Sequence, residues 1–168
     1  VRDSITNIIT VDANGSGDYT TIAEAYAAII GSSINQYEVV IYPGIYHEKN
    51  LVTPPFTHTH GTQPNTVIVT SEGLGGGSDP VFEQRANTRL SNMTIISDTG
   101  YCVHFDHTNN KNCALVNENL YLKKITYGAI IGGGTRGNGA LYIWRNCTFE
   151  NGTAACHTSG SSVNWDNT

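Results

Sequence analysis

Four asparagines recur with a constant 27-residue spacing, and each opens a short strand-like run. They are Asn65, Asn92, Asn119 and Asn146, and Glu38 stands one period earlier in the same frame, before Val-Val-Ile-Tyr. A fixed period of this size is typical of a chain that stacks one supersecondary unit on the next. The spacing therefore predicts a solenoid, in which the functional surface lies along the side of the stack.

The alternation of side chains within these runs predicts which positions face the core. Successive side chains of a strand point to opposite faces, so the first and third residues after each asparagine position share one face. We expect these two columns to point inward: Val39, Thr66, Met93, Leu120 and Cys147, and Ile41, Ile68, Ile95, Leu122 and Phe149. We expect the column between them to point outward: Val40, Val67, Thr94, Tyr121 and Thr148.

Two further expectations concern polar groups on the stack. The next outward column places Lys123 beside Glu150, which predicts an ion pair between adjacent coils. The recurrent asparagines favour a structural role, because asparagine tolerates left-handed backbone geometry and stacked amides hydrogen-bond along a stack. The alternative is a row of amides that binds a ligand.

The composition favours an all-β protein and excludes some functions. Charged residues make up 14% of the 168, the net charge is −5, and the basic residues are scattered, which argues against phosphate-rich partners such as nucleic acids. No apolar run approaches the roughly 20 residues of a membrane helix. Residues 158–168 offer few apolar side chains for the last coil. We therefore expect that the stack continues beyond this chain or is closed by another subunit.

The cysteine spacing argues against a metal site and against a disulfide between Cys102 and Cys156. Cys102, Cys113, Cys147 and Cys156 form no Cys-x-x-Cys pair, so a structural zinc site is not expected. Cys102 and Cys156 lie two periods apart, which corresponds to roughly 10 Å along a β-stack. That distance exceeds the roughly 7 Å Cα limit of a disulfide. The cysteines are therefore predicted to be small buried hydrophobic residues, and no metal or other cofactor is expected.

The N-terminal segment 1–36 differs from the coils that follow in 37–168. Thr21 and Glu24 have the spacing of a capping box, and apolar residues follow at helical intervals up to Gly31. An amphipathic helix within residues 18–31 is therefore predicted to cover the first coil. Two segments, 54–64 and 71–89, interrupt the repeat and are expected to be loops.

Residues 11–22 and 39–48 resemble the start of a pectin methylesterase, with Gly44, Tyr46 and Glu48 matching a Gly-x-Tyr-x-Glu motif. The resemblance implies a right-handed, single-stranded parallel β-helix that begins behind a capping helix. The family's catalytic motifs, Gln-Asp-Thr, Asp-Phe-Ile-Phe-Gly and Gly-Arg-Pro-Trp, are absent from this sequence. No catalytic residue can therefore be transferred from the family.

The second half of the chain is similar to the β-helical appendages of bacteriophage virions. The similar stretches are 97–106, 129–134, 144–149 and 156–157. This resemblance implies a virion structural protein of the tail spike, tail fibre or capsid decoration type, at the virion surface or outside the cell. The implied partners are other virion subunits or further copies of the chain, as a trimer by analogy with viral fibres, with possible contact to surface glycans.

The alternative is a carbohydrate-active enzyme, either a polysaccharide depolymerase or a divergent pectinesterase or lyase. Such enzymes use paired carboxylates or a histidine–carboxylate pair as acid and base, and the candidates are His104, Asp106, His107, Glu118 and Glu150. The competing interpretation makes His104 and Asp106 ordinary solvent-facing residues, with Val103 and Phe105 inward. His58 and His60 alternate like metal ligands, but no third ligand accompanies them.

Aromatic side chains supply the candidate ligand-binding residues. Tyr121, Tyr142 and Trp144 are expected to point outward, where flat ring faces could stack on sugars. The alternative is that they are buried between protomers or under a loop.

Overall fold

The computed structural model describes residues 7–75, 77–105, 110–126, 128–133, 140–152, 154–158 and 162–166, with the backbone alone for 154–158 and 162–165. Within these ranges the chain forms one helix and fifteen strands. They are α1 (Ile22–Ala27), β1 (Asn7–Val11), β2 (Tyr37–Ile41), β3 (Gly44–His47), β4 (Leu51–Val52), β5 (Thr57–Gly61), β6 (Val67–Thr70), β7 (Phe82–Glu83), β8 (Thr88–Ser97), β9 (Val103–His104), β10 (Ala114–Lys124), β11 (Ala129–Gly133), β12 (Leu141–Arg145), β13 (Thr148–Glu150), β14 (Ala154–Thr158) and β15 (Ser162–Asp166). No helix in these ranges is long and apolar enough to span a membrane.

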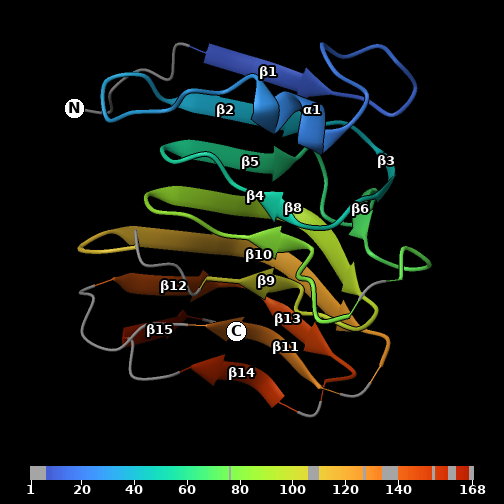
Figure 1. Cartoon of the computed structure of the whole chain (residues 1–168), viewed down its shortest axis with the longest axis vertical. Coiled ribbons are helices and arrows are strands. Elements are labelled where there is room, and N and C mark those ends of the chain that lie inside the picture. The colour runs from blue at the N-terminus through green and yellow to red at the C-terminus, as the bar shows by residue number, and fades with distance from the viewer. Residues whose placement is uncertain are drawn as a thin grey trace.

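The strands stack in parallel as a β-solenoid of about five coils (Figure 1). One sheet has ten strands, with β1, β2, β5, β8, β10, β12 and β15 in order along its main path and β3, β6 and β13 pairing at its side. The second sheet has five strands, in the order β14, β11, β9, β7 and β4. The chain passes from one sheet to the other once per coil, so the predicted parallel β-helix is confirmed.

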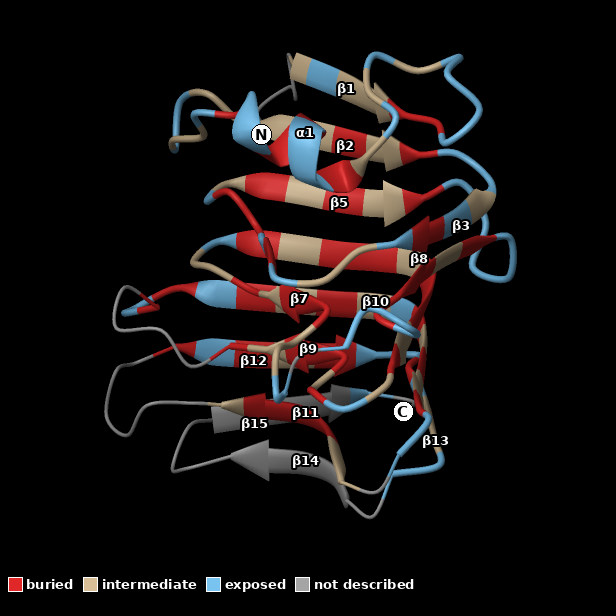
Figure 2. Ribbon diagram, turned by 45° about the vertical axis from the view of Figure 1, so that its right-hand side comes forward, coloured by how far each residue is buried: buried red, intermediate tan, exposed pale blue. Residues whose placement is uncertain are grey.

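The predicted register holds in the middle of the stack. Met93 pairs with Leu120, and Ile95 pairs with Leu122. Both pairs are buried at 0–2% exposure, as the inward columns predicted. In Figure 2 buried residues recur along the stacked strands β5, β8 and β10. Cys102, Cys113 and Cys147 are buried free thiols, which confirms the prediction for these three.

The register predicted for the first coils is wrong. Val39 pairs with Thr59, a step much shorter than the period of the asparagines, so the segment predicted as the loop 54–64 contains strand β5. In the next run Ile68 pairs with Thr94 rather than with Ile95. A shift of one residue exchanges the two faces of a strand. Val67 is therefore buried rather than outward, Thr66 is exposed and Ile68 is only partly buried.

Three smaller expectations are also corrected. The segment 71–89, expected to be a loop, contains β7 and the first residues of β8. In the outward column Thr94 is 8% exposed, and its hydroxyl donates to the carbonyl oxygen of Pro64 at 2.8 Å. The backbone of Cys156 aligns with Ile131 and, one coil further, with Val103, not with Cys102.

The recurrent asparagines form the corners between strand faces. Asn92, Asn119 and Asn146 have φ of 54°, 52° and 50°, in the left-handed region that asparagine tolerates. The Nδ2 of Asn119 donates to the Oδ1 of Asn92 on the neighbouring coil at 3.1 Å. These contacts support the structural role predicted for the asparagines. Asn65 does not share the left-handed backbone.

The residues of the Gly-x-Tyr-x-Glu motif hold the N-terminal cap in place. The carboxylate of Glu48 accepts hydrogen bonds from the backbone N–H groups of Ile22 and Ala23, both at 2.9 Å. These N–H groups lie in the first turn and have no partner within the helix. Tyr46 donates its hydroxyl to the carbonyl oxygen of Tyr42 at 2.9 Å. The motif thus has a structural explanation that requires no catalytic activity.

The rest of the cap agrees with the sequence except in length. Thr21 is the N-cap of α1, as predicted, and its side chain accepts the N–H of Glu24 at 3.2 Å. The helix ends at Ala27, one turn before Gly31. Beside it, Asp18 accepts the backbone N–H of Thr10 at 2.8 Å. This contact covers part of the outer edge of β1, where an open strand would invite pairing.

Candidate functional site

A strip of polar side chains crosses the outward face of the ten-stranded sheet. Register places His58 beside Arg89, and it places His60, Ser91, Glu118 and Arg145 in one line on β5, β8, β10 and β12. Because alternate residues of a strand share a face, the two lines lie side by side. We call this surface the polar strip: Glu38, His58, His60, Arg89, Ser91, Glu118 and Arg145.

The histidines of the polar strip are each hydrogen-bonded to a neighbour. His60 Nε2 lies 2.7 Å from Glu38 Oε1. His58 Nε2 lies 2.8 Å from Ser91 Oγ. The two imidazole rings are 4.8 Å apart. A serine beside a histidine suggests a nucleophile and its base, but Ser91 is only 2% exposed and is closed to a polymeric substrate.

Glu118, one of the predicted catalytic candidates, lies between two arginines. Its Oε1 is 2.9 Å from Arg145 Nη1, and its Oε2 forms an ion pair with Arg89. The Glu118 side chain is 14% exposed, against 43% for Arg89 and 47% for Arg145. Both carboxylate oxygens are occupied by guanidinium groups, so this carboxylate is poorly placed to accept a proton from a substrate.

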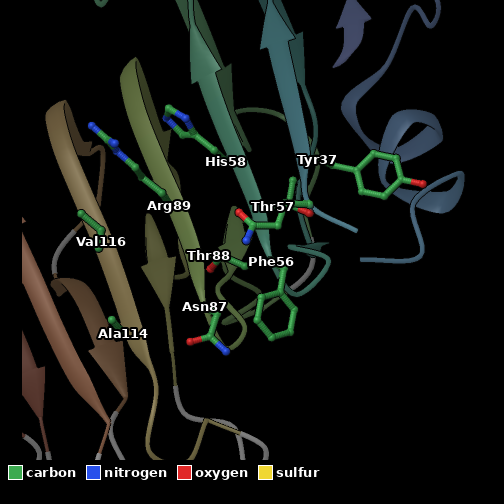
Figure 3. A pocket seen from close by; sticks show the side chains of 10 residues that line it. Tyr37, Phe56, Thr57, His58, Asn87, Thr88, Arg89, Ala114 and Val116 are labelled. Carbon is green, nitrogen blue, oxygen red and sulfur yellow. The ribbon is translucent and has the colours of Figure 1, made fainter. Parts of the chain in front are cut away.

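A groove of about 290 Å³ lies beside the polar strip, at the N-terminal ends of four adjacent strands. It crosses β2, β5, β8 and β10, which corresponds to roughly 14 Å at the usual strand spacing. In Figure 3 the Phe56 ring and the Asn87 amide project past the strand starts, whereas His58 and Arg89 project from the strands themselves. The residues that line this groove are Gln36, Tyr37, Phe56, Thr57, His58, Asn87, Thr88, Arg89, Ala114 and Val116.

His104, the central catalytic candidate, lies on the five-stranded sheet and is separate from the polar strip. Its Nδ1 lies 2.6 Å from Glu83 Oε2, and its ring stacks on Tyr101 with centroids 5.4 Å apart. Val103 and Phe105 are fully buried, as the competing interpretation expected. The other two members of the predicted cluster, Asp106 and His107, lie outside the described residues.

Glu150 and the aromatic candidates have different outcomes. Glu150 Oε1 lies 3.1 Å from Lys123 Nζ, so the predicted ion pair is confirmed. Tyr121 is partly exposed, in the outward column. Tyr142 and Trp144 are fully buried, which contradicts the prediction that they face outward. Tyr142 shares the register position of the core residue Leu115, so both aromatic residues lie inside the coil.

Apart from His58, the sequence did not single out the residues that line the groove. Phe56 lies in a segment predicted to be a loop, and Arg89 lies at the end of another. Their positions depend on the short step between β2 and β5. The 27-residue spacing of the asparagines does not predict a step of this length. The Pro54-Pro55 pair before Phe56 was the available signal, because consecutive prolines mark a rigid turn. Within the described residues no three His, Cys, Asp or Glu side chains come together as a metal site.

The environment of His58 predicts a pH dependence of stability. Burial, then the charges of Arg89 and His60, lowers the pKa of His58 from 6.5 to about 3. His58 therefore binds a proton near pH 6.5 in the unfolded chain, but only near pH 3 in the folded protein. Stability is retained above pH 6.5 and falls as the pH drops from 6.5 toward 3, by up to about 1.4 kcal/mol per pH unit.

Replacing this histidine tests the expected slope. In urea unfolding between pH 6.5 and pH 5, we expect His58→Gln to lose less stability with falling pH than the wild type. His47 is exposed on β3, so His47→Gln is the matched control and should keep the wild-type slope. Equal slopes in wild type and His58→Gln would contradict the shifted pKa.

Comparison with known proteins identifies the fold. No protein-family model matches the chain, and no curated protein is similar to it in sequence. Among solved structures, pectin methylesterase PemA from Erwinia chrysanthemi is similar over 94% of this chain and 56% of that chain, with 16% identity and a TM-score of 0.58. Pectin methylesterase from carrot is similar over 89% and 54%, with 18% identity and a TM-score of 0.60.

A pectin methylesterase mutant in complex with a hexasaccharide is similar over 94% of this chain and 56% of that chain, with 17% identity and a TM-score of 0.60. This chain spans just over half the length of these structures. At these identities the similarity establishes the fold: a pectin methylesterase-like parallel β-helix.

Proposed function

We propose that this β-helix is a saccharide-binding protein of the virion-appendage type, which contacts surface glycans through the groove without cleaving them. The observation that carries the proposal is the composition of the groove. Two aromatic side chains, Tyr37 and Phe56, accompany hydrogen-bonding groups from Asn87 and Arg89 on an open surface. Sugars combine apolar ring faces with hydroxyl groups, and such a mixed surface suits both.

The carboxylates nearest the groove support binding rather than cleavage. Glu38 is paired with His60 at 2.7 Å, and Glu118 is held by Arg89 and Arg145. Retaining and inverting glycosidases need two carboxylates that face the scissile bond. Here both carboxylates are engaged by basic side chains of the protein. The similar structures include one solved with a hexasaccharide, which is consistent with a sugar ligand on this fold.

Blocking the groove tests the proposed function. Ala114 is exposed at the start of β10 and lines the groove. We expect Ala114→Trp to weaken binding at least about tenfold, a change of about 1.4 kcal/mol, on a panel of alginate, hyaluronan, dextran and xylan. Ala23→Trp, on an exposed position of α1, should bind like the wild type. Wild-type protein that binds no member of the panel, or Ala114→Trp that binds normally, would refute the proposal.

A second candidate is a carbohydrate-active enzyme centred on the five-stranded sheet. The 2.6 Å contact between His104 and Glu83 is the observation that favours it, since a carboxylate can orient a histidine for general acid–base catalysis. The same saccharide panel distinguishes the two functions. New reducing ends or unsaturated products, lost in Glu83→Gln, would favour the enzyme over the binding protein.

The virion assignment and the trimer belong to the same proposal. They rest on the resemblance to β-helical phage appendages noted for residues 97–106, 129–134, 144–149 and 156–157. We expect the chain to be found at a virion surface or outside the cell, with copies of itself or other virion subunits as partners. Sedimentation equilibrium of the purified protein should give a trimer, and a strictly monomeric protein would refute that part.

A further inference from the structure

Phe56 is an exception to a rule that the rest of the described chain follows. Eight residues other than glycine have a left-handed φ, and seven of them are asparagines. The eighth is Phe56, with a φ of 58°. Asparagine tolerates this conformation, whereas for a bulky side chain it is a genuine outlier. The seven asparagines are Asn50, Asn87, Asn92, Asn112, Asn119, Asn146 and Asn151.

The neighbouring coil shows what the fold itself prefers at this position. Phe56 stands two residues before His58, and Asn87 stands two residues before Arg89. His58 and Arg89 are register partners, so Phe56 and Asn87 occupy the same corner of adjacent coils. At this corner the next coil has an asparagine, which adopts the same left-handed conformation with a φ of 57°.

The backbone of this corner is held by two contacts. The carbonyl oxygen of Phe56 accepts the N–H of Tyr37 at 3.2 Å. One residue earlier, Pro55 presses against Gly31, where an added Cβ would lie 2.0 Å from the Pro55 carbonyl oxygen. A strained conformation persists only where its surroundings impose it. The tight packing of this corner therefore imposes the left-handed backbone. It does not require a phenylalanine at this position.

The ring of Phe56 does not contribute to the core. The partly buried hydrophobic residues that pack against the core cluster include Tyr37 and Phe149 but not Phe56. The Phe56 side chain instead lines the groove (Figure 3). Core packing therefore gives no reason to place a phenylalanine here in spite of the strain.

We infer that Phe56 is a ligand-contacting residue: its ring, set by a strained corner, is the platform on which a saccharide ring stacks in the groove. This inference rests on the proposed function and deepens it. Strained backbone tends to cluster at ligand-binding sites, where it fixes a side chain before the ligand arrives. An aromatic face held in this way binds the apolar face of a sugar with little further loss of conformational freedom.

The test replaces Phe56 by the residue that the next coil uses. We expect Phe56→Asn to raise the midpoint of thermal unfolding by about 2–4 °C, because the strain is relieved, and to weaken saccharide binding about tenfold. The probes are the oligosaccharides of alginate, hyaluronan, dextran and xylan that the wild type binds. Phe56→Tyr keeps both the ring and the strain, so its unfolding midpoint should not rise and its saccharide binding should fall less than that of Phe56→Asn.

The outcomes separate this inference from the proposed function. If the wild type binds none of the four saccharides, the proposed function fails. If the wild type binds and Phe56→Asn binds equally well, the proposed function stands and the role of Phe56 is refuted. A lower unfolding temperature for Phe56→Asn would show that the ring stabilises the fold, and it would also overturn the inference.

Discussion

Trp144→Ala should lower the free energy of unfolding by about 3–5 kcal/mol, the usual cost of emptying a buried aromatic position. Trp144 is fully buried, and its ring centroid lies 5.7 Å from that of Phe149 and 6.5 Å from that of Phe105. Removing the indole leaves a cavity between coils that cannot collapse, because the strands on each side are fixed by their hydrogen-bond ladders. Urea unfolding followed by circular dichroism would measure the loss.

Tyr121→Ala is the matched control for the assigned faces. Tyr121 is an aromatic residue of the neighbouring strand β10, but it lies in the outward column and is partly exposed. We expect its replacement to cost about 1 kcal/mol or less. Equal losses in Tyr121→Ala and Trp144→Ala would contradict the inward position of the tryptophan.

Gly61→Ala should destabilise the stack by about 3 kcal/mol or more, because overpacking here meets backbone. A Cβ on Gly61 would lie 2.2 Å from the carbonyl oxygen of Asn92 and 2.9 Å from Cβ of Val67. The Asn92 carbonyl belongs to a left-handed corner and cannot move without disturbing the register of β8. The adjacent coils would have to separate, which should appear as a lower unfolding midpoint.

Gly44→Ala provides the comparison. Gly44 begins the Gly-x-Tyr-x-Glu motif, yet the nearest atom to an added Cβ is a ring carbon of Tyr46 at 3.4 Å, an ordinary contact. We expect its stability to equal that of the wild type or to rise slightly, because alanine restricts the unfolded chain. A Gly61→Ala protein as stable as Gly44→Ala would show that β5 and the Asn92 corner are not tightly packed.

Parts of the fold could be predicted because they depend on local patterns. The spacing of Asn92 and Asn119, with apolar residues at alternate positions, indicates equal coils and an inward column wherever the period holds. The Thr21 cap follows from a short local motif that ends at Glu24. The predicted ion pair of Lys123 with Glu150 needed only the frame of the asparagines, which is correct at that end of the chain.

The candidate site could be predicted much less well. Strand β5 has threonines, Thr57 and Thr59, at its inward positions, so it lacks the apolar signal of a strand. With β5 missing from the frame, His58 is a loop histidine whose only apparent companion is His60. Its contact with Ser91 follows only from the pairing of β5 with β8.

Repetition along the chain was sufficient to indicate a stack of β-coils and most of its interior, because periodicity records which faces must be hidden from water. The lengths of individual coils, and therefore the partners across them, were decided by tertiary packing. The short coil from β2 to β5 lies beside longer ones and changes the pairings around it. A shift of one residue is enough to turn a side chain from the core to the surface. Phe56 and Arg89 therefore line the same groove, which the sequence pattern did not reveal.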